Sequence, residues 1–100
     1  MLPTALLPSY QFDGTTITFN LADLSGLTAA EADAATGDGR KVAFELIRQI
    51  QSRIAAANPA PVGVTATKNT PTGLTATTVR QTYNLAFDLD ISGSDVVNAV

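Results

Sequence analysis

The 100-residue chain contains no cysteine and no histidine. Without them the protein has no disulfide, no thiol nucleophile and none of the commonest zinc ligands. The lack of histidine also removes the side chain most often used for acid–base catalysis near neutral pH. A Ser-His-Asp arrangement is therefore impossible, and no Gly-x-Ser-x-Gly motif replaces it. We expect a protein that is not an enzyme and that uses no cofactor and no metal.

Charged residues are also scarce. They make up 15% of the chain, against about 25% in typical soluble domains, whereas 45% of the residues are hydrophobic. The net charge of −3 and the six dispersed basic residues argue against nucleic acid and anionic membranes as partners. Neither a signal peptide nor an apolar run of about 20 residues is present, so we expect synthesis in the cytoplasm. A surface with so little charge suits contacts with other proteins.

The chain is long enough for one domain, and its two ends are apolar. We divide it into an extended N-terminal arm (residues 1–14), a single domain (15–93) and a short C-terminal tail (94–100). Pro3 and Pro8 fix φ and withhold amide donors in the arm, which a turn at Asp13 and Gly14 ends. We expect the arm to pack on its own domain or on a neighbouring protein, and the tail to fold back on its own sheet or helix.

The first half of the domain predicts a strand followed by a helix. Residues 15–21 alternate apolar and polar side chains, as a half-buried strand does. Thr28 and Glu31 have the spacing of a capping box, which predicts a short helical turn. The main helix is expected to begin after Asp38 and to end before Asn58-Pro59, because a proline disfavours helical backbone in the residue before it. Its polar face is expected to carry Lys41, Glu45, Arg48, Gln49, Ser52 and Arg53.

Two further strands are predicted at residues 62–67 and 79–91. In the second, Val79, Tyr83, Leu85, Phe87, Leu89 and Ile91 share one face, and Arg80, Thr82, Asn84, Ala86, Asp88 and Asp90 share the other. This longest and most apolar strand comes last and is expected to be central. The predicted fold class is therefore α+β: a small antiparallel or mixed sheet in β-α-β-β order, a split unit with one main helix on one face. The other face looks towards solvent or a partner.

Partner-binding positions follow from the two predicted edge strands, residues 15–21 and 62–67. Neither contains a charged residue, and uncharged edges invite pairing with another chain. The alternative is that the arm pairs with its own edge. The residues that we expect to contact protein partners are Leu2, Leu6, Leu7, Tyr10, Ile17, Phe19, Arg40, Lys41, Val62, Val64 and Arg80.

Two groups of charges have more than one interpretation. Arg40 and Lys41 oppose the dipole in the first turn of the main helix, so we expect an acidic partner: Glu31, Asp33 or a carboxylate of another chain. Binding of a phosphate by this helix end is a weaker alternative. Asp88 and Asp90 lie about 7 Å apart on one strand face, but calcium needs more oxygen ligands. We favour a solvated or partner-facing surface there.

Four segments carry a resemblance to a known family: TITFNL (16–21), LTAAEAD (27–33), TGDGRKVAF (36–44) and YNLAFDLDI (83–91). Over roughly residues 15–93 the chain resembles small virion structural proteins of tailed phages, particularly phages that infect cyanobacteria. The resemblance implies no catalytic residues. It implies a virion protein that forms a homo-oligomer and binds the major capsid protein or other virion proteins.

A capsid cement or decoration protein is the leading expectation. A neck or tail component of the virion is one alternative. A soluble host-directed module that binds a protein or a glycan is another.

Overall fold

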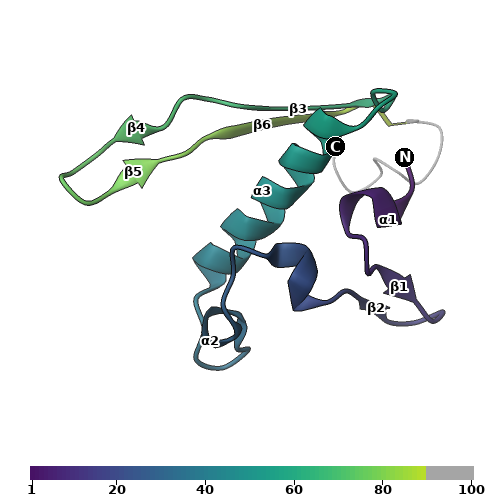
Figure 1. Ribbon diagram of the computed structural model, residues 1–100, viewed down its shortest axis with the longest axis horizontal. Helices are drawn as coiled ribbons and strands as arrows, with labels where there is room; N and C mark the ends of the chain where they lie inside the picture. The colour runs from purple at the N-terminus through teal and green to yellow at the C-terminus, as the bar shows by residue number, and fades with distance from the viewer. Residues whose placement is uncertain (90–100) are drawn as a thin grey trace.

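The computed structural model describes residues 1–89 and has one main helix beside small antiparallel strand pairs (Figure 1). The predicted α+β class is thereby confirmed. In chain order the elements are α1 (Pro3–Leu6), β1 (Gln11–Phe12), β2 (Ile17–Thr18), the 3-10 helix η1 (Leu21–Leu24), α2 (Ala29–Ala32), α3 (Gly39–Ala56), β3 (Val64–Lys68), β4 (Thr72–Gly73), β5 (Val79–Arg80) and β6 (Tyr83–Phe87). The predicted C-terminal tail lies outside the described residues.

The helix boundaries agree with the local sequence signals. Asp38 is the N-cap of α3, and its carboxylate accepts the backbone N–H two residues further on at 3.0 Å. The helix ends at Ala56, before the predicted stop at Asn58-Pro59. At α2, Thr28 Oγ1 accepts from Glu31 N at 3.2 Å, while Glu31 Oε1 accepts from Thr28 N at 2.9 Å. This reciprocal pair is the predicted capping box.

Strands β3 and β6 form the antiparallel pair that packs on α3. Ala66 lies opposite Leu85 in the register and is buried. The rings of Phe44 on α3 and Tyr83 on β6 lie 6.1 Å apart in a tilted arrangement, so alternate residues of β6 face the helix. The other face of the pair carries the exposed side chains of Thr65, Thr67, Asn84 and Ala86.

The strand order differs from the prediction. Within the described residues β6 pairs with β3 alone, and β2 pairs with β1 instead of with β6. The predicted split unit with a central last strand is therefore wrong for these residues. The reason is local: Gly14 adopts φ +104°, and Asp13 Oδ1 accepts N–H groups from Thr15 and Thr16 at 2.9 and 2.7 Å. A turn held in this way makes a hairpin at little loop-closure cost.

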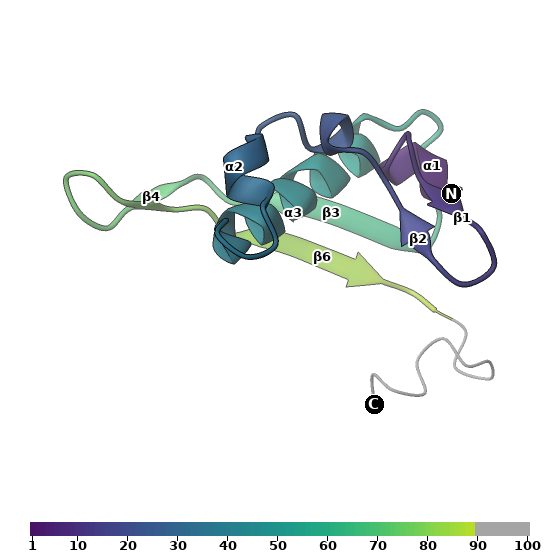
Figure 2. The ribbon, with the colours of Figure 1, turned by 90° about the horizontal axis from the view of Figure 1, so that it is seen from below.

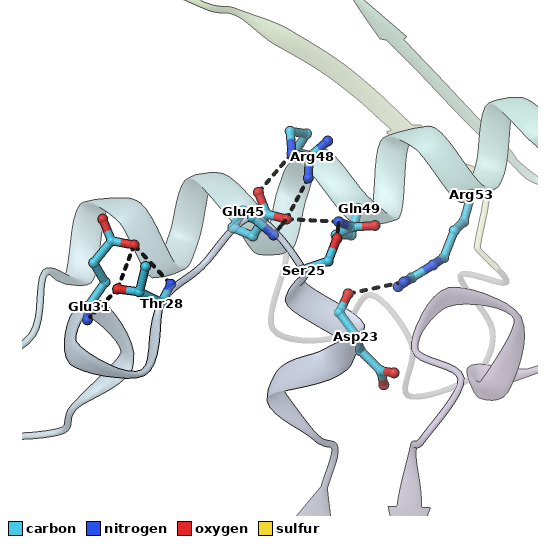
Figure 3. A network of polar contacts seen from close by, with 9 residues as sticks. Asp23, Ser25, Thr28, Glu31, Glu45, Arg48, Gln49 and Arg53 are labelled. Carbon is cyan, nitrogen blue, oxygen red and sulfur yellow. Dashed lines mark hydrogen bonds and ion pairs between the residues drawn. The ribbon is translucent and has the colours of Figure 1, made fainter.

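The N-terminal arm is neither extended nor free. Residues Pro3–Leu6 form a helical turn, which the proline permits because the first helical N–H has no partner in any case. Arg53 of α3 donates to the carbonyl oxygen of Leu6 at 2.5 Å and to that of Asp23 at 3.0 Å (Figure 3). Ser9 donates its N–H and its hydroxyl to the Asp23 carboxylate at 2.9 and 2.6 Å. The arm thus belongs to the domain and pairs with its own edge strand.

The polar face of α3 is covered at Glu45, whereas Lys41 and Ser52 on the same face are exposed. Glu45 is only 3% exposed. Its carboxylate accepts two bonds from Arg48, both at 2.7 Å, one from Gln49 Nε2 at 2.8 Å, and one from the N–H of Gly26 at 2.8 Å (Figure 3). A buried carboxylate is tolerated when it is fully hydrogen-bonded and paired with a cation. These bonds fasten the segment around Gly26 to the helix.

Gly26 is required at this contact. A Cβ atom at this position would lie 2.6 to 2.8 Å from three atoms of the Glu45 carboxyl group, closer than van der Waals contact permits. Leu24 and Leu27, on either side of Gly26, are buried.

Within residues 1–89 the buried apolar side chains are those of Leu24, Leu27, Ile54 and Ala66. In the same part of the chain no helix is long and apolar enough to cross a membrane.

We predict that Gly26→Ala lowers the free energy of unfolding by about 1–3 kcal/mol, the usual cost of an extra group in a packed site. The matched control is Gly39→Ala, at the start of α3, where an added Cβ meets nothing within 4 Å. Urea unfolding followed by circular dichroism measures both variants. Equal stability of the two variants would contradict the close contact at Gly26.

The buried carboxylate also predicts an acid-sensitive fold. Arg48, then Gln49 and the Gly26 N–H, lower the pKa of Glu45 from 4.5 to about 2. Because the folded pKa lies below the unfolded one, the stabilisation is complete above pH 4.5 and is lost as the pH falls towards 2. Lys41 and Thr28 lower the pKa of Glu31 in the same direction.

We therefore expect the urea midpoint to fall between pH 5 and about 2.5. In Glu45→Gln the slope of this fall should be smaller, because one of the groups responsible no longer titrates. A variant with the same slope as the unsubstituted protein would show that Glu45 does not contribute.

Candidate protein-binding surface

More large apolar side chains are exposed than buried in the described part of the chain. The exposed ones are Met1, Leu2, Phe12, Ile17, Phe19, Leu21, Phe44, Val62, Leu74, Val79, Phe87 and Leu89. Scattered single exposures are normal, but exposed apolar side chains that adjoin one another mark interaction sites. Their grouping along the fold therefore decides where a partner can bind.

The first group lies on the β1–β2 hairpin. Phe12 stands directly opposite Ile17 in the register, and these two side chains are 63% and 56% exposed. Side chains two residues apart on a strand share a face, so Phe19 continues the same face beyond β2. We call Phe12, Ile17 and Phe19 the hairpin surface.

Hydrogen bonds hold the hairpin surface in place at both ends. The turn closes on Asp13, whose pKa is lowered by the N–H groups of Thr16 and Thr15. At the other end Ser9 Oγ accepts the N–H of Asn20 at 2.6 Å and donates to the Asp23 carboxylate. Asp13 is the only charged residue from residue 11 to residue 18, and its carboxylate is occupied within the turn. The surface suits an apolar partner of low charge.

The second group lies at one end of the β3–β6 pair. Phe87 is opposite Val64 and is 57% exposed. Val62, just before β3, is 98% exposed, and Leu89 follows β6. These side chains lie away from the turn that leads to β4.

The third feature is the projecting hairpin formed by β4 and β5. It extends past the end of α3 in both views (Figures 1 and 2). Gly73 pairs with Val79 and Thr72 with Arg80, and every residue from 67 to 80 is exposed. Threonine dominates this segment, so it presents hydroxyl groups to a partner.

The predicted partner-binding residues do not form one surface. Ile17 and Phe19 belong to the hairpin surface, whereas Arg80 lies on the projecting hairpin. Leu2 and Val62 are exposed at separate places. The half-buried residues of the set are Leu6, Leu7, Tyr10 and Val64.

The two predicted cations at the start of α3 have carboxylates of their own chain nearby. Lys41 Nζ lies 2.5 Å from Glu31 Oε2, which confirms one of the partners that the dipole argument named. Arg40 is almost fully exposed, 3.8 Å from Asp38. Asp88 is exposed, but Asp90 lies outside the described residues. Within residues 1–89 no three carboxylates are grouped closely enough to hold a metal ion.

The predicted set of partner-binding residues omits three exposed aromatic residues: Phe12, Phe44 and Phe87. The exposure of Phe12 on a hairpin could have been predicted from the sequence. Tyr10 and Phe12 precede the Asp13-Gly14 turn with the same spacing as Ile17 and Phe19, which follow it. Apolar alternation on both sides of such a turn is a hairpin pattern. The exposure of Phe44 and Phe87 depends on where α3 crosses the sheet, which no local pattern reveals.

The chain was compared with protein-family models, with curated proteins and with solved structures. None of these matches it. The candidate surface is therefore defined by the geometry and chemistry of this chain alone.

We predict that the double variant Phe12→Ser and Ile17→Thr unfolds with a free energy within about 1 kcal/mol of the unsubstituted protein, because exposed pairs contribute little. Its retention on a hydrophobic-interaction column should decrease. The control is Leu24→Ala, a buried site, where we expect a loss of about 2–5 kcal/mol. A large loss of stability in the double variant would show that the hairpin surface belongs to the core.

Proposed function

We propose that this protein is a non-enzymatic structural protein of a tailed-phage virion, specifically a capsid cement or decoration protein that binds the shell in several copies. The observation that carries the binding role is the hairpin surface: an uncharged apolar patch that is exposed on a fixed hairpin. The resemblance in sequence to small phage virion proteins supports the virion as the proposed place of assembly.

The hairpin surface has the properties of a binding site for protein. Aromatic side chains such as Phe12 and Phe19 contribute much of the binding energy in protein interfaces when a partner covers them. The bonds from Asp13 and Ser9 fix the hairpin before binding, which lowers the entropy lost on association. A partner with a shallow apolar groove, such as a shell subunit, fits this surface.

Two other roles remain as alternatives. A neck or tail component would use the same surface on a different virion protein. A soluble host-directed module is favoured by the projecting hairpin, because residues 67–80 expose threonine hydroxyl groups and backbone to a protein or a glycan.

Quantitative mass spectrometry of purified phage particles tests the virion role. We expect the protein at a fixed number of copies per major capsid protein, and labelled protein on intact particles to bind along the shell. Labelling confined to the neck or tail would select that alternative. Absence from particles, with the protein present in the soluble lysate, would reject the virion role.

The hairpin surface is tested on the same particles. We expect Phe12→Ser with Ile17→Thr to reduce occupancy about tenfold or more, since truncation of the few central residues that dominate an interface costs about 2 kcal/mol or more each. The control is Leu74→Ser on the projecting hairpin, which should leave occupancy unchanged. The opposite result would move the binding site to the projecting hairpin. Deletion of residues 1–12 is a poorer test, because it removes the Ser9 donors of the buried Asp23.

A further inference from the structure

The outer edge of β6 presents unused backbone groups. Asp88 N donates to Gly63 O at 2.7 Å, and Asn69 N donates to Thr82 O at 2.9 Å. In an antiparallel pair the hydrogen-bonded positions alternate, and with this register they fall on the even-numbered residues of β6. The residues of β6 whose N–H and C=O groups point away from β3 are Tyr83, Leu85 and Phe87.

The two edges of the β3–β6 pair differ in their surroundings. On β3 the outward carbonyl of Ala66 accepts from Gln51 Nε2 of α3 at 3.3 Å, and Lys68 places a charge at the end of the strand. Helix α3 packs more extensively on β3 than on β6. In Figure 2, β6 is the strand of the pair that lies farther from α1 and β2. Within residues 1–89 no hydrogen bond involves the outward groups of β6, and β6 contains no charge.

Apolar side chains flank this open edge. The residues with outward backbone groups also face α3, because Tyr83 contacts Phe44. Phe44 remains 46% exposed beside β6, and Phe87 is more than half exposed. A strand added here would therefore gain apolar contacts as well as backbone bonds.

We propose that the outer edge of β6 pairs with the same edge of a second copy of this chain. The two strands run antiparallel with a two-fold axis at Leu85, so that Leu85 faces the second copy's Leu85. Tyr83 then lies opposite the second copy's Phe87, and Phe44 lies beside that ring. The result is a four-stranded sheet in the order β3–β6–β6–β3 with both helices on one face.

The sequence of β6 is self-complementary in this register. Reading Tyr-Asn-Leu-Ala-Phe against its own reverse places leucine opposite leucine and aromatic opposite aromatic, and aromatic cross-strand pairs stabilise a sheet. About six backbone bonds form between the copies, from three residues on each strand. A two-fold interface uses the same patch on both subunits. The uncharged and self-complementary β6 strand can therefore pair with the β6 strand of a second copy.

Pairing with a second copy also explains why an edge strand such as β6 is apolar. Two-stranded sheets are marginally stable on their own, and the most apolar strand is expected at the centre of a sheet. Within one chain β6 is an edge, but in the dimer it becomes central. This self-association does not depend on the proposed role in a virion and is tested on the purified protein.

Light scattering coupled to gel filtration over a dilution series tests the dimer. We expect twice the 10.4 kDa chain mass at high concentration, and a dissociation constant about thirtyfold higher for Phe87→Pro, which removes one outward N–H in each copy but no bond to β3. The matched control is Lys68→Pro, which removes an outward N–H from the edge of β3 and should leave the dimer intact. Circular dichroism checks that both variants fold.

A monomeric unsubstituted protein at every concentration would overturn the proposal. So would equal weakening of the dimer by Phe87→Pro and Lys68→Pro.

A disulfide tests the register, because the chain has no other cysteine. Two facing residues at a hydrogen-bonded position of an antiparallel pair lie about 5.5 Å apart, within disulfide range. Leu85→Cys should therefore form a covalent dimer on mild oxidation, whereas Thr67→Cys, on β3, should not. Equal cross-linking of the two variants would overturn the two-fold axis at Leu85.

Discussion

The buried carboxylate of Glu45 is the interaction on which the N-terminal half of the protein depends. It receives donors from Arg48 and Gln49 on its own helix and from the backbone of Gly26. Two turns further along the same helix, the positively charged side chain of Arg53 donates hydrogen bonds to carbonyl oxygens of α1 and η1. One face of α3 thus organises the first third of the chain through hydrogen bonds, while the other face packs on the sheet.

This division explains why so few large side chains are buried. Hydrogen bonds to charged groups are directional and strong when solvent is excluded, so they fix the position of η1 and the hairpin without a large apolar core. Apolar side chains that a core would otherwise bury, such as Phe12, Phe44 and Phe87, remain at the surface. Stability within the chain therefore relies on charged hydrogen bonds, and the exposed apolar side chains remain available for the contacts that we propose.

Local signals in the sequence predicted local structure well. The caps at Thr28 and Asp38 and the stop at Asn58-Pro59 each depend on a few neighbouring residues, and each lies where it was expected. The burial of Glu45 was not predictable, because its polar neighbours on the helix suggest solvent and its cover comes from a loop nineteen residues earlier. The pairing of β2 was also mispredicted, since a hairpin closed by Asp13 competes successfully with a distant strand. The candidate surface was foreseen only in part, at Ile17 and Phe19.

The bond between Arg53 and the carbonyl of Leu6 spans 47 residues of sequence. During synthesis on the ribosome the N-terminal segment emerges first, yet the guanidinium group that fastens it is translated only near the end of α3. The hairpin with Phe12 and Ile17 can close by itself in the meantime, but its attachment to the body of the protein must wait for the helix. The order of translation therefore leaves this apolar hairpin unattached until the helix that fastens it has been made.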